Sequence, residues 1–114
     1  MDGKILHWSY RDFHCFPEEI LKESDNLEEI YLKENFIPSL PVWLFELTNL
    51  NFINLCGNNI TIIPDEISKL VNLNFFDISS NCLKVLPKSL CYLKNLERLL
   101  VSSNQLNFLP QGFC

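Results

Sequence analysis

The sequence predicts an α/β solenoid, in which each coil contributes one short parallel strand and then returns through an irregular or short helical segment. Two observations lead to this prediction: a hydrophobic pattern with a period of 23 residues, and an asparagine at the same position of each repeat. The pattern is most complete in residues 50–72, which read LNFINLCGNNITIIPDEISKLVN. A lone coil cannot bury its own apolar face, so a fixed period of this length indicates stacked coils.

Each repeat opens with a leucine, and further apolar residues follow three and five positions later. The opening residues are Leu27, Leu50, Leu73 and Leu96. Side chains alternate between the two faces of a strand, so the later pair points inward while the residues around it face solvent. Equivalent strands of stacked coils run in the same direction. We therefore expect one parallel sheet whose inner face is covered by the rest of each coil.

An asparagine follows each predicted strand, where the chain has to turn. This column consists of Asn35, Asn58, Asn81 and Asn104. An amide side chain carries two donors and an acceptor, so stacked asparagines can pair backbone groups that the turn leaves buried. We expect these residues to form a structural ladder, in which the loss of one asparagine costs about 1–3 kcal/mol.

The second half of each repeat carries a Leu-Pro or Ile-Pro pair, followed by two apolar positions. The pairs occupy residues 40–41, 63–64, 86–87 and 109–110. With the strand and asparagine columns, this L-x-x-L-x-L-x-x-N-x-L and L-P-x-x-h-x-x-L pattern resembles the leucine-rich repeat family. Within that family it is similar to the intracellular group of the Ras-suppressor, Scribble and Erbin proteins. The resemblance implies a curved right-handed solenoid with a concave sheet, and a scaffold or adaptor role in signalling.

The repeat register divides the chain into five segments. We expect residues 1–26 to form a degenerate N-terminal capping repeat, in which Leu6 and Trp8 point inward and Arg11 stands in place of the asparagine. The repeats that follow are 27–49, 50–72, 73–95 and a partial one at 96–114. The partial repeat offers no polar cap. We expect either that the chain is a fragment or short isoform of a longer array, or that this end docks or self-associates.

Charge and hydropathy exclude two classes of partner. The net charge is −5 and the pI is about 4.9, which disfavours binding to nucleic acid or to anionic membranes. The chain has no apolar run of the length that membrane insertion or a signal peptide requires. These features predict a cytoplasmic protein that binds neither nucleic acid nor membranes.

Cysteine usage also favours a reducing compartment. The count of five is odd, and no cysteine cluster flanks the repeats. Cys91 and Cys114 occupy the same offset in adjacent coils, within possible disulfide reach. In a reducing compartment we expect two free thiols instead.

No residue pattern predicts a catalytic, cofactor or metal site. His7, His14 and Cys15 lie close in sequence, but no Cys-x-x-Cys or His-x-x-x-His spacing completes a zinc site. Three scattered glycines form no phosphate-binding loop. We therefore expect no cofactor and no metal. We also expect no enzyme activity, because enzymes that contain related repeats need an added catalytic domain.

The outward strand positions are the best candidate for a partner-binding surface. In register, they bring together Glu29, Tyr31, Lys33, Phe52, Asn54, Phe75, Asp77, Arg98 and Leu100. Phe52 and Phe75 should lie on adjacent strands about 4.8 Å apart. Exposed aromatic residues inside a charged rim are typical of a protein-binding hot spot. The alternative is that the cross-strand pair of phenylalanines only stabilises the sheet.

The sequence therefore predicts a non-catalytic module that binds a protein partner on its concave face. A regulatory subunit that modulates a GTPase or a phosphatase is the alternative. The two differ in readout, because the second would change the rate of its partner enzyme.

Overall fold

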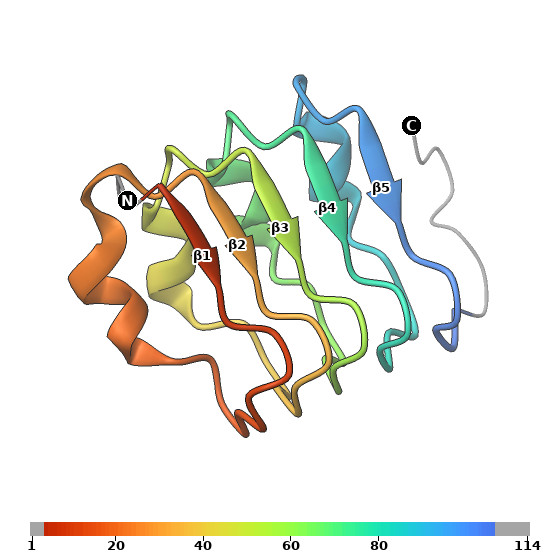
Figure 1. Cartoon of the computed structure of the whole chain (residues 1–114). Coiled ribbons are helices and arrows are strands. Elements are labelled where there is room, and N and C mark those ends of the chain that lie inside the picture. Colours follow the sequence, from red (N-terminus) through yellow and green to blue (C-terminus); the bar gives the residue numbers. More distant parts are fainter. Residues whose placement is uncertain (1–3, 107–114) are drawn as a thin grey trace.

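The computed structural model describes residues 4–106 and contains one parallel sheet with the strand order β1-β2-β3-β4-β5. The strands are β1 (Ile5–His7), β2 (Glu29–Tyr31), β3 (Phe52–Asn54), β4 (Phe75–Asp77) and β5 (Arg98–Leu100). Figure 1 shows them side by side, with the rest of each coil behind the sheet. The predicted solenoid is confirmed.

The returning half of each of the first four coils carries a short 3-10 helix. These helices are η1 (Glu18–Asn26), η2 (Val42–Glu46), η3 (Asp65–Lys69) and η4 (Lys88–Tyr92). A proline stands immediately before each of them. Pro41, Pro64 and Pro87 are the N-cap residues of η2, η3 and η4, with extended backbone, and the carbonyl oxygen of each accepts the first hydrogen bond of the helix that follows. The Leu-Pro column therefore sets where each return begins.

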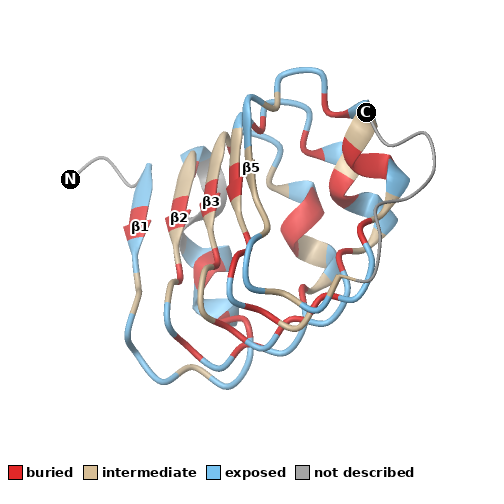
Figure 2. Cartoon of the chain, turned by 90° about the vertical axis from the view of Figure 1, so that its right-hand side faces the viewer, coloured by how far each residue is buried: buried red, intermediate tan, exposed pale blue. Residues whose placement is uncertain are grey.

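The core is a single cluster of apolar side chains between the sheet and the returns. In β2, β3 and β4 the middle residue is fully buried, while the residues on either side are half-buried. Figure 2 shows this by colour for β2 and β3. Phe45 is also fully buried, although its repeat column gave no sign of it. The equivalent positions in the next coils hold Ser68 and Cys91, so no apolar column marks this site.

Each asparagine of the ladder joins its own coil to the preceding one. The Oδ1 atom of Asn58 accepts a hydrogen bond from the Ile37 amide at 3.0 Å. Its Nδ2 atom donates to the carbonyl oxygens of Leu32 and Leu55, both at 3.0 Å. Asn81 and Asn104 repeat this arrangement one and two coils further on. The side chain thus pairs backbone groups that the turn withdraws from the sheet.

The first coil has no asparagine of its own, and Asn35 serves it from the second coil. The Oδ1 atom of Asn35 accepts from the amides of Arg11 and Phe13, at 2.9 and 3.0 Å. Its Nδ2 atom donates to the carbonyl oxygen of Trp8 at 3.1 Å. Asn35 thus supplies, from the second coil, the side-chain hydrogen bonds to the turn after β1.

The residue before each asparagine adopts a left-handed backbone conformation. Glu34, Gly57, Ser80 and Ser103 have φ values of 56°, 78°, 55° and 55°. Only glycine enters this region without a steric cost. Three of the four coils therefore accept backbone strain at the same point of the turn.

Three expectations lie outside the described part of the chain. These are the end of the partial repeat at 96–114 with its Leu-Pro pair at 109–110, the docking or self-association of the C-terminal end, and the state of Cys114.

Candidate functional site

The sheet register places the predicted partner-binding residues on the outward side of the strands. We call this surface the concave face. It carries Glu29, Tyr31, Lys33, Phe52, Asn54, Phe75, Asp77, Arg98 and Leu100. Arg98 is exposed and the other eight side chains are half-buried. The surface is therefore tightly covered by its own side chains and has few freely projecting groups.

Four rings form a continuous row across β1 to β4 on the concave face. The rings of Phe52 and Phe75 stack with centroids 4.1 Å apart and planes 2° apart. Tyr31 contacts Phe52 at 4.9 Å, and His7 stacks on Tyr31 at 4.6 Å. We call these four residues the aromatic row. The sequence led us to expect that Phe52 and Phe75 are exposed. In the structure both are half-buried, because each ring covers its neighbour.

His7 is the member of the row that the sequence analysis missed. It is directly opposite Tyr31 in the register of β1 and β2. The column that contains Tyr31 was visible in the sequence, but a lone histidine in it gives no sign of stacking. The row therefore begins at β1, two strands before the predicted pair of Phe52 and Phe75.

The hydroxyl of Tyr31 is engaged within its own strand. It donates a hydrogen bond to Oε1 of Glu29 at 3.0 Å. Burial raises the pKa of Tyr31, and the hydrogen bond to Glu29 and the charge of that carboxylate raise it further. The phenol therefore stays neutral at physiological pH and offers its ring to the surface.

Two predicted binding residues also close the ends of their strands. Oδ1 of Asn54 accepts from the Cys56 amide at 3.1 Å, and Oδ1 of Asp77 accepts from the Ser79 amide at 3.0 Å. Such contacts, two residues along the chain, are local turns that Asn and Asp readily form. One oxygen of each side chain therefore has a structural role, which the sequence analysis did not foresee.

None of the charged residues at the rim of the concave face (Glu29, Lys33, Asp77 and Arg98) forms an ion pair with another described residue. Within residues 4–106, ion pairs join Lys4 to Glu28 at 3.8 Å and Lys69 to Glu46 at 3.3 Å. In that same range Lys33 and Arg98 form none. Both cations can therefore engage carboxylates of an incoming surface without first breaking an internal pair.

The thiol of Cys56 on this face is not activated. Burial raises its pKa, and the nearby charges of Asp77 and Glu34 raise it further, against smaller opposite effects of Lys33 and Ser80. A neutral thiol is a poor nucleophile and a poor metal ligand. In the described part of the chain, no three His, Cys, Asp or Glu residues are grouped to hold a metal ion.

One cysteine expectation is wrong. Cys91 is disulfide-bonded, so it is not the free thiol that a reducing compartment would imply. Cys15, Cys56 and Cys82 are free. Within residues 4–106, no helix has the length and apolar character needed to cross a membrane.

Known proteins share this architecture. The family profile described as leucine rich repeat matches residues 48–106. A leucine-rich repeat protein of Leptospira interrogans is 30% identical, with a TM-score of 0.75, over 87% of this chain and 24% of its own. The complex of BIR3 and SERK2 from Arabidopsis thaliana contains a chain that is 29% identical, with a TM-score of 0.72, over 82% of this chain and 51% of its own.

A third structure supports the fold alone. The leucine-rich repeat domain of APL1B has a TM-score of 0.84 at 19% identity, over 94% of this chain and 34% of its own. The chain thus spans between 24% and 51% of the lengths of these three structures. No curated protein matches the sequence at a significant level.

Proposed function

Because the chain belongs to the leucine-rich repeat family, we propose that it is a non-catalytic module that binds a protein partner through its concave face. Repeats of this family generally mediate contacts between proteins. One structural neighbour was solved as a complex of two proteins, BIR3 and SERK2, which supports the same class of role here.

The aromatic row is the observation that carries this proposal. Binding hot spots are enriched in large aromatic side chains within a rim that excludes water. The row is also held rigid, because the stacked rings of Phe52 and Phe75 restrict each other and the Tyr31 hydroxyl is tied to Glu29. A preorganised surface loses little conformational entropy on binding, so more of the contact energy appears as affinity.

The alternative role of the phenylalanine pair is to stabilise the sheet. Stacking does contribute about 0.5–1.5 kcal/mol beyond burial, so the two roles overlap. They differ in the role that they give to Arg98, an exposed residue directly opposite Phe75 in the register of β4 and β5. A binding role requires the rim as well as the rings, whereas a stabilising role requires the rings alone.

A scaffold or adaptor role in intracellular signalling extends this proposal. Its support is the similarity of the L-P-x-x-h-x-x-L half-repeat to the Ras-suppressor, Scribble and Erbin group. A cytoplasmic location is part of this proposal, and thiol labelling in intact cells would test it.

The test is partner capture by two variants that act in different ways. Phe52→Ala with Phe75→Ala removes the stacked rings, and Arg98→Glu reverses one rim charge. We expect both to reduce capture by at least about tenfold, which corresponds to about 1.4 kcal/mol. Tyr92→Ala is the matched control, because Tyr92 is 67% exposed and lies in η4, away from the sheet. Thermal unfolding shows whether each variant remains folded.

Unchanged capture by the folded double variant would remove the aromatic row from the proposal. Loss with the double variant but not with Arg98→Glu would favour the stabilising role.

A further inference from the structure

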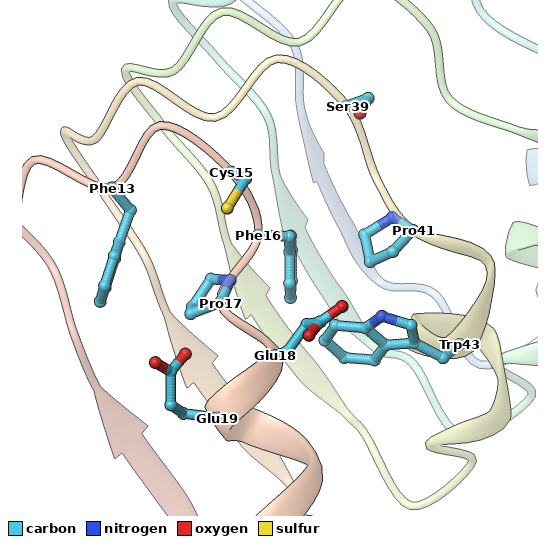
Figure 3. A pocket seen from close by; sticks show the side chains of 9 residues that line it. All are labelled: Phe13, Cys15, Phe16, Pro17, Glu18, Glu19, Ser39, Pro41 and Trp43. Atoms are coloured by element: carbon cyan, nitrogen blue, oxygen red, sulfur yellow. The ribbon is translucent and has the colours of Figure 1, made fainter.

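A pocket lies between the first and second coils, on elements separate from the concave face. Its walls come from residues 13–19, which lead into η1, and from residues 39–43, which lead into η2. Its volume is about 350 Å³, near the lower end of the range of small-ligand sites. Figure 3 shows the nine side chains that line it. We call it the first-coil pocket.

Aromatic rings form the floor of this pocket. Phe16 is buried in the core and meets Trp43 edge-on, with centroids 5.5 Å apart and planes 80° apart. Trp43 is half-buried and packs against the same core. The indole is therefore held by its neighbours while part of it remains open to the pocket. A fixed indole surface is the best aromatic partner that proteins offer to a cation.

Two carboxylates provide the polar part of the wall. Glu18 and Glu19 are both exposed and begin η1 directly after Pro17. Figure 3 shows the Glu18 carboxylate pointing toward the Trp43 indole, with Glu19 on the other side of Pro17. Neither forms an ion pair with a described residue. The described lining contains no basic side chain, so its charge is negative.

Lys22 is the nearest cation along the helix. It lines a separate depression with Glu18, Glu19 and Leu21, and it does not line the first-coil pocket. The negative charge beside Trp43 is therefore not cancelled from within the pocket. A concave site of one charge sign with apolar walls focuses its field on an incoming ion of the opposite sign.

We propose that the first-coil pocket binds the guanidinium group of an arginine in a partner polypeptide. A guanidinium is planar, stacks on an aromatic face and donates two parallel hydrogen bonds to one carboxylate. Trp43 supplies the face, Glu18 accepts the hydrogen bonds, and Glu19 adds negative potential. An ammonium group fits this arrangement less well, because it is a compact and strongly hydrated charge.

This site does not depend on the concave face. Its residues belong to the convex returns of the first two coils, whereas the aromatic row belongs to the strands. Variants of one surface should leave the other unchanged, so the two proposals can fail separately.

The first test is a titration with three short blocked peptides that differ in one residue: arginine, its neutral isostere citrulline, or trimethyllysine. The indole N–H signal of Trp43 in a ¹H–¹⁵N spectrum reports binding, and only one other tryptophan is present. We expect the arginine peptide to bind at least about tenfold more tightly than the citrulline peptide. Equal binding of these two would overturn the proposal. Tighter binding of the trimethyllysine peptide would overturn the assignment of a guanidinium.

The variants Glu18→Gln and Trp43→Leu should each remove this preference for arginine. Asp65→Asn is the matched control, because Asp65 follows Pro64 in η3 as Glu18 follows Pro17 in η1. The control should keep the affinity within about twofold, since one neutralised acid elsewhere changes only the screened long-range field. An equal loss in the control would show that net charge, and not the pocket, attracts the peptide.

The second test needs no ligand and uses the wild-type fold. Cys15 lines the pocket and its thiol is free. For each thiol, mass spectrometry of its peptide gives the ratio of the modification rate with a cationic methanethiosulfonate reagent to the rate with an anionic one. We expect this ratio to be higher for Cys15 than for Cys82. Glu18→Gln with Glu19→Gln should reduce this relative preference. The same charge preference at both thiols, or one that is insensitive to the double variant, would contradict the assigned potential.

Discussion

The first coil and the interior coils differ in how they are joined to their neighbours and in the length of the 3-10 helix through which they return. The coil centred on β3 has neighbours on both sides, bridged by Asn58 and Asn81, and it returns through a five-residue 3-10 helix. Among the described residues, the first coil packs against the second coil alone, lacks the asparagine of the ladder, and returns through a nine-residue 3-10 helix. The residue types of a coil packed between two others are restricted by both neighbours, whereas those of the first coil are restricted by the second coil alone. The first-coil pocket lies between these first two coils.

Core truncation should separate the two regions most clearly. Ile53→Ala removes a fully buried side chain from the central strand, and we expect a loss of about 2–5 kcal/mol in the free energy of unfolding. Leu6→Ala, in edge strand β1, should cost less because the chain there can relax on its open side. Chemical denaturation measures both. Equal losses would mean that the first coil is as constrained as the interior.

The asparagine ladder should show the next largest effect. Asn58→Ala leaves the buried amide of Ile37 and two buried carbonyl oxygens without their partner, at a cost of about 1–3 kcal/mol. Asn59→Ala, at the exposed neighbouring position, is the control. The melting temperature should fall for the first variant and hold for the second, with partner binding unaffected in both. An unchanged melting temperature for Asn58→Ala would contradict the structural role of the ladder.

The left-handed position tests a smaller backbone effect. Gly57→Ala adds a Cβ atom at φ +78°, and this atom would also meet the carboxylate end of Glu34. We expect a loss of about 1 kcal/mol in the free energy of unfolding. Ser103→Ala is the control, since serine already carries a Cβ atom in this conformation. Equal stability of Gly57→Ala and wild type would mean that the turn relaxes to accept the side chain.

The smallest expected effect is the titration of Tyr31. Its pKa is raised above the ordinary 10.0 by burial and by Glu29, so the folded chain holds this proton more tightly than the unfolded chain does. The resulting stability is present below the unfolded pKa and is lost as pH rises through the folded pKa. Glu29→Gln should lower the pKa of Tyr31, as read from phenolate absorbance. Glu66→Gln, in η3, should leave it unchanged.

The sequence predicted the repeated parts of the molecule and missed the unrepeated ones. A period of 23 residues makes each inward position visible several times over, so the sheet and its buried columns could be predicted. Phe45 was missed because the next two coils carry Ser68 and Cys91 at the equivalent position. The contribution of His7 to the aromatic row was missed because one residue makes no pattern.

The candidate sites could be predicted only in outline. Register places Phe52 beside Phe75, but the degree to which stacked rings bury each other depends on rotamers that no pattern specifies. The sequence likewise does not specify whether the side chains of Asn54 and Asp77 face solvent or bond to the backbone. In the structure their Oδ1 atoms accept hydrogen bonds from backbone amides. The first-coil pocket forms between equivalent segments of the first two coils, 13–19 and 39–43, but the equivalents of Trp43 in the other described coils are Glu19, Glu66 and Ser89, so no aromatic column marks the site.

The most direct test of the concave-face proposal is site-specific photo-crosslinking. One variant carries benzoylphenylalanine at position 75, within the aromatic row, and a second carries it at position 92, which lies in η4 on the opposite side of the coil. We predict a covalent product with a single protein partner from position 75 and none from position 92. The same product from both positions, or from position 92 alone, would contradict binding through the concave face.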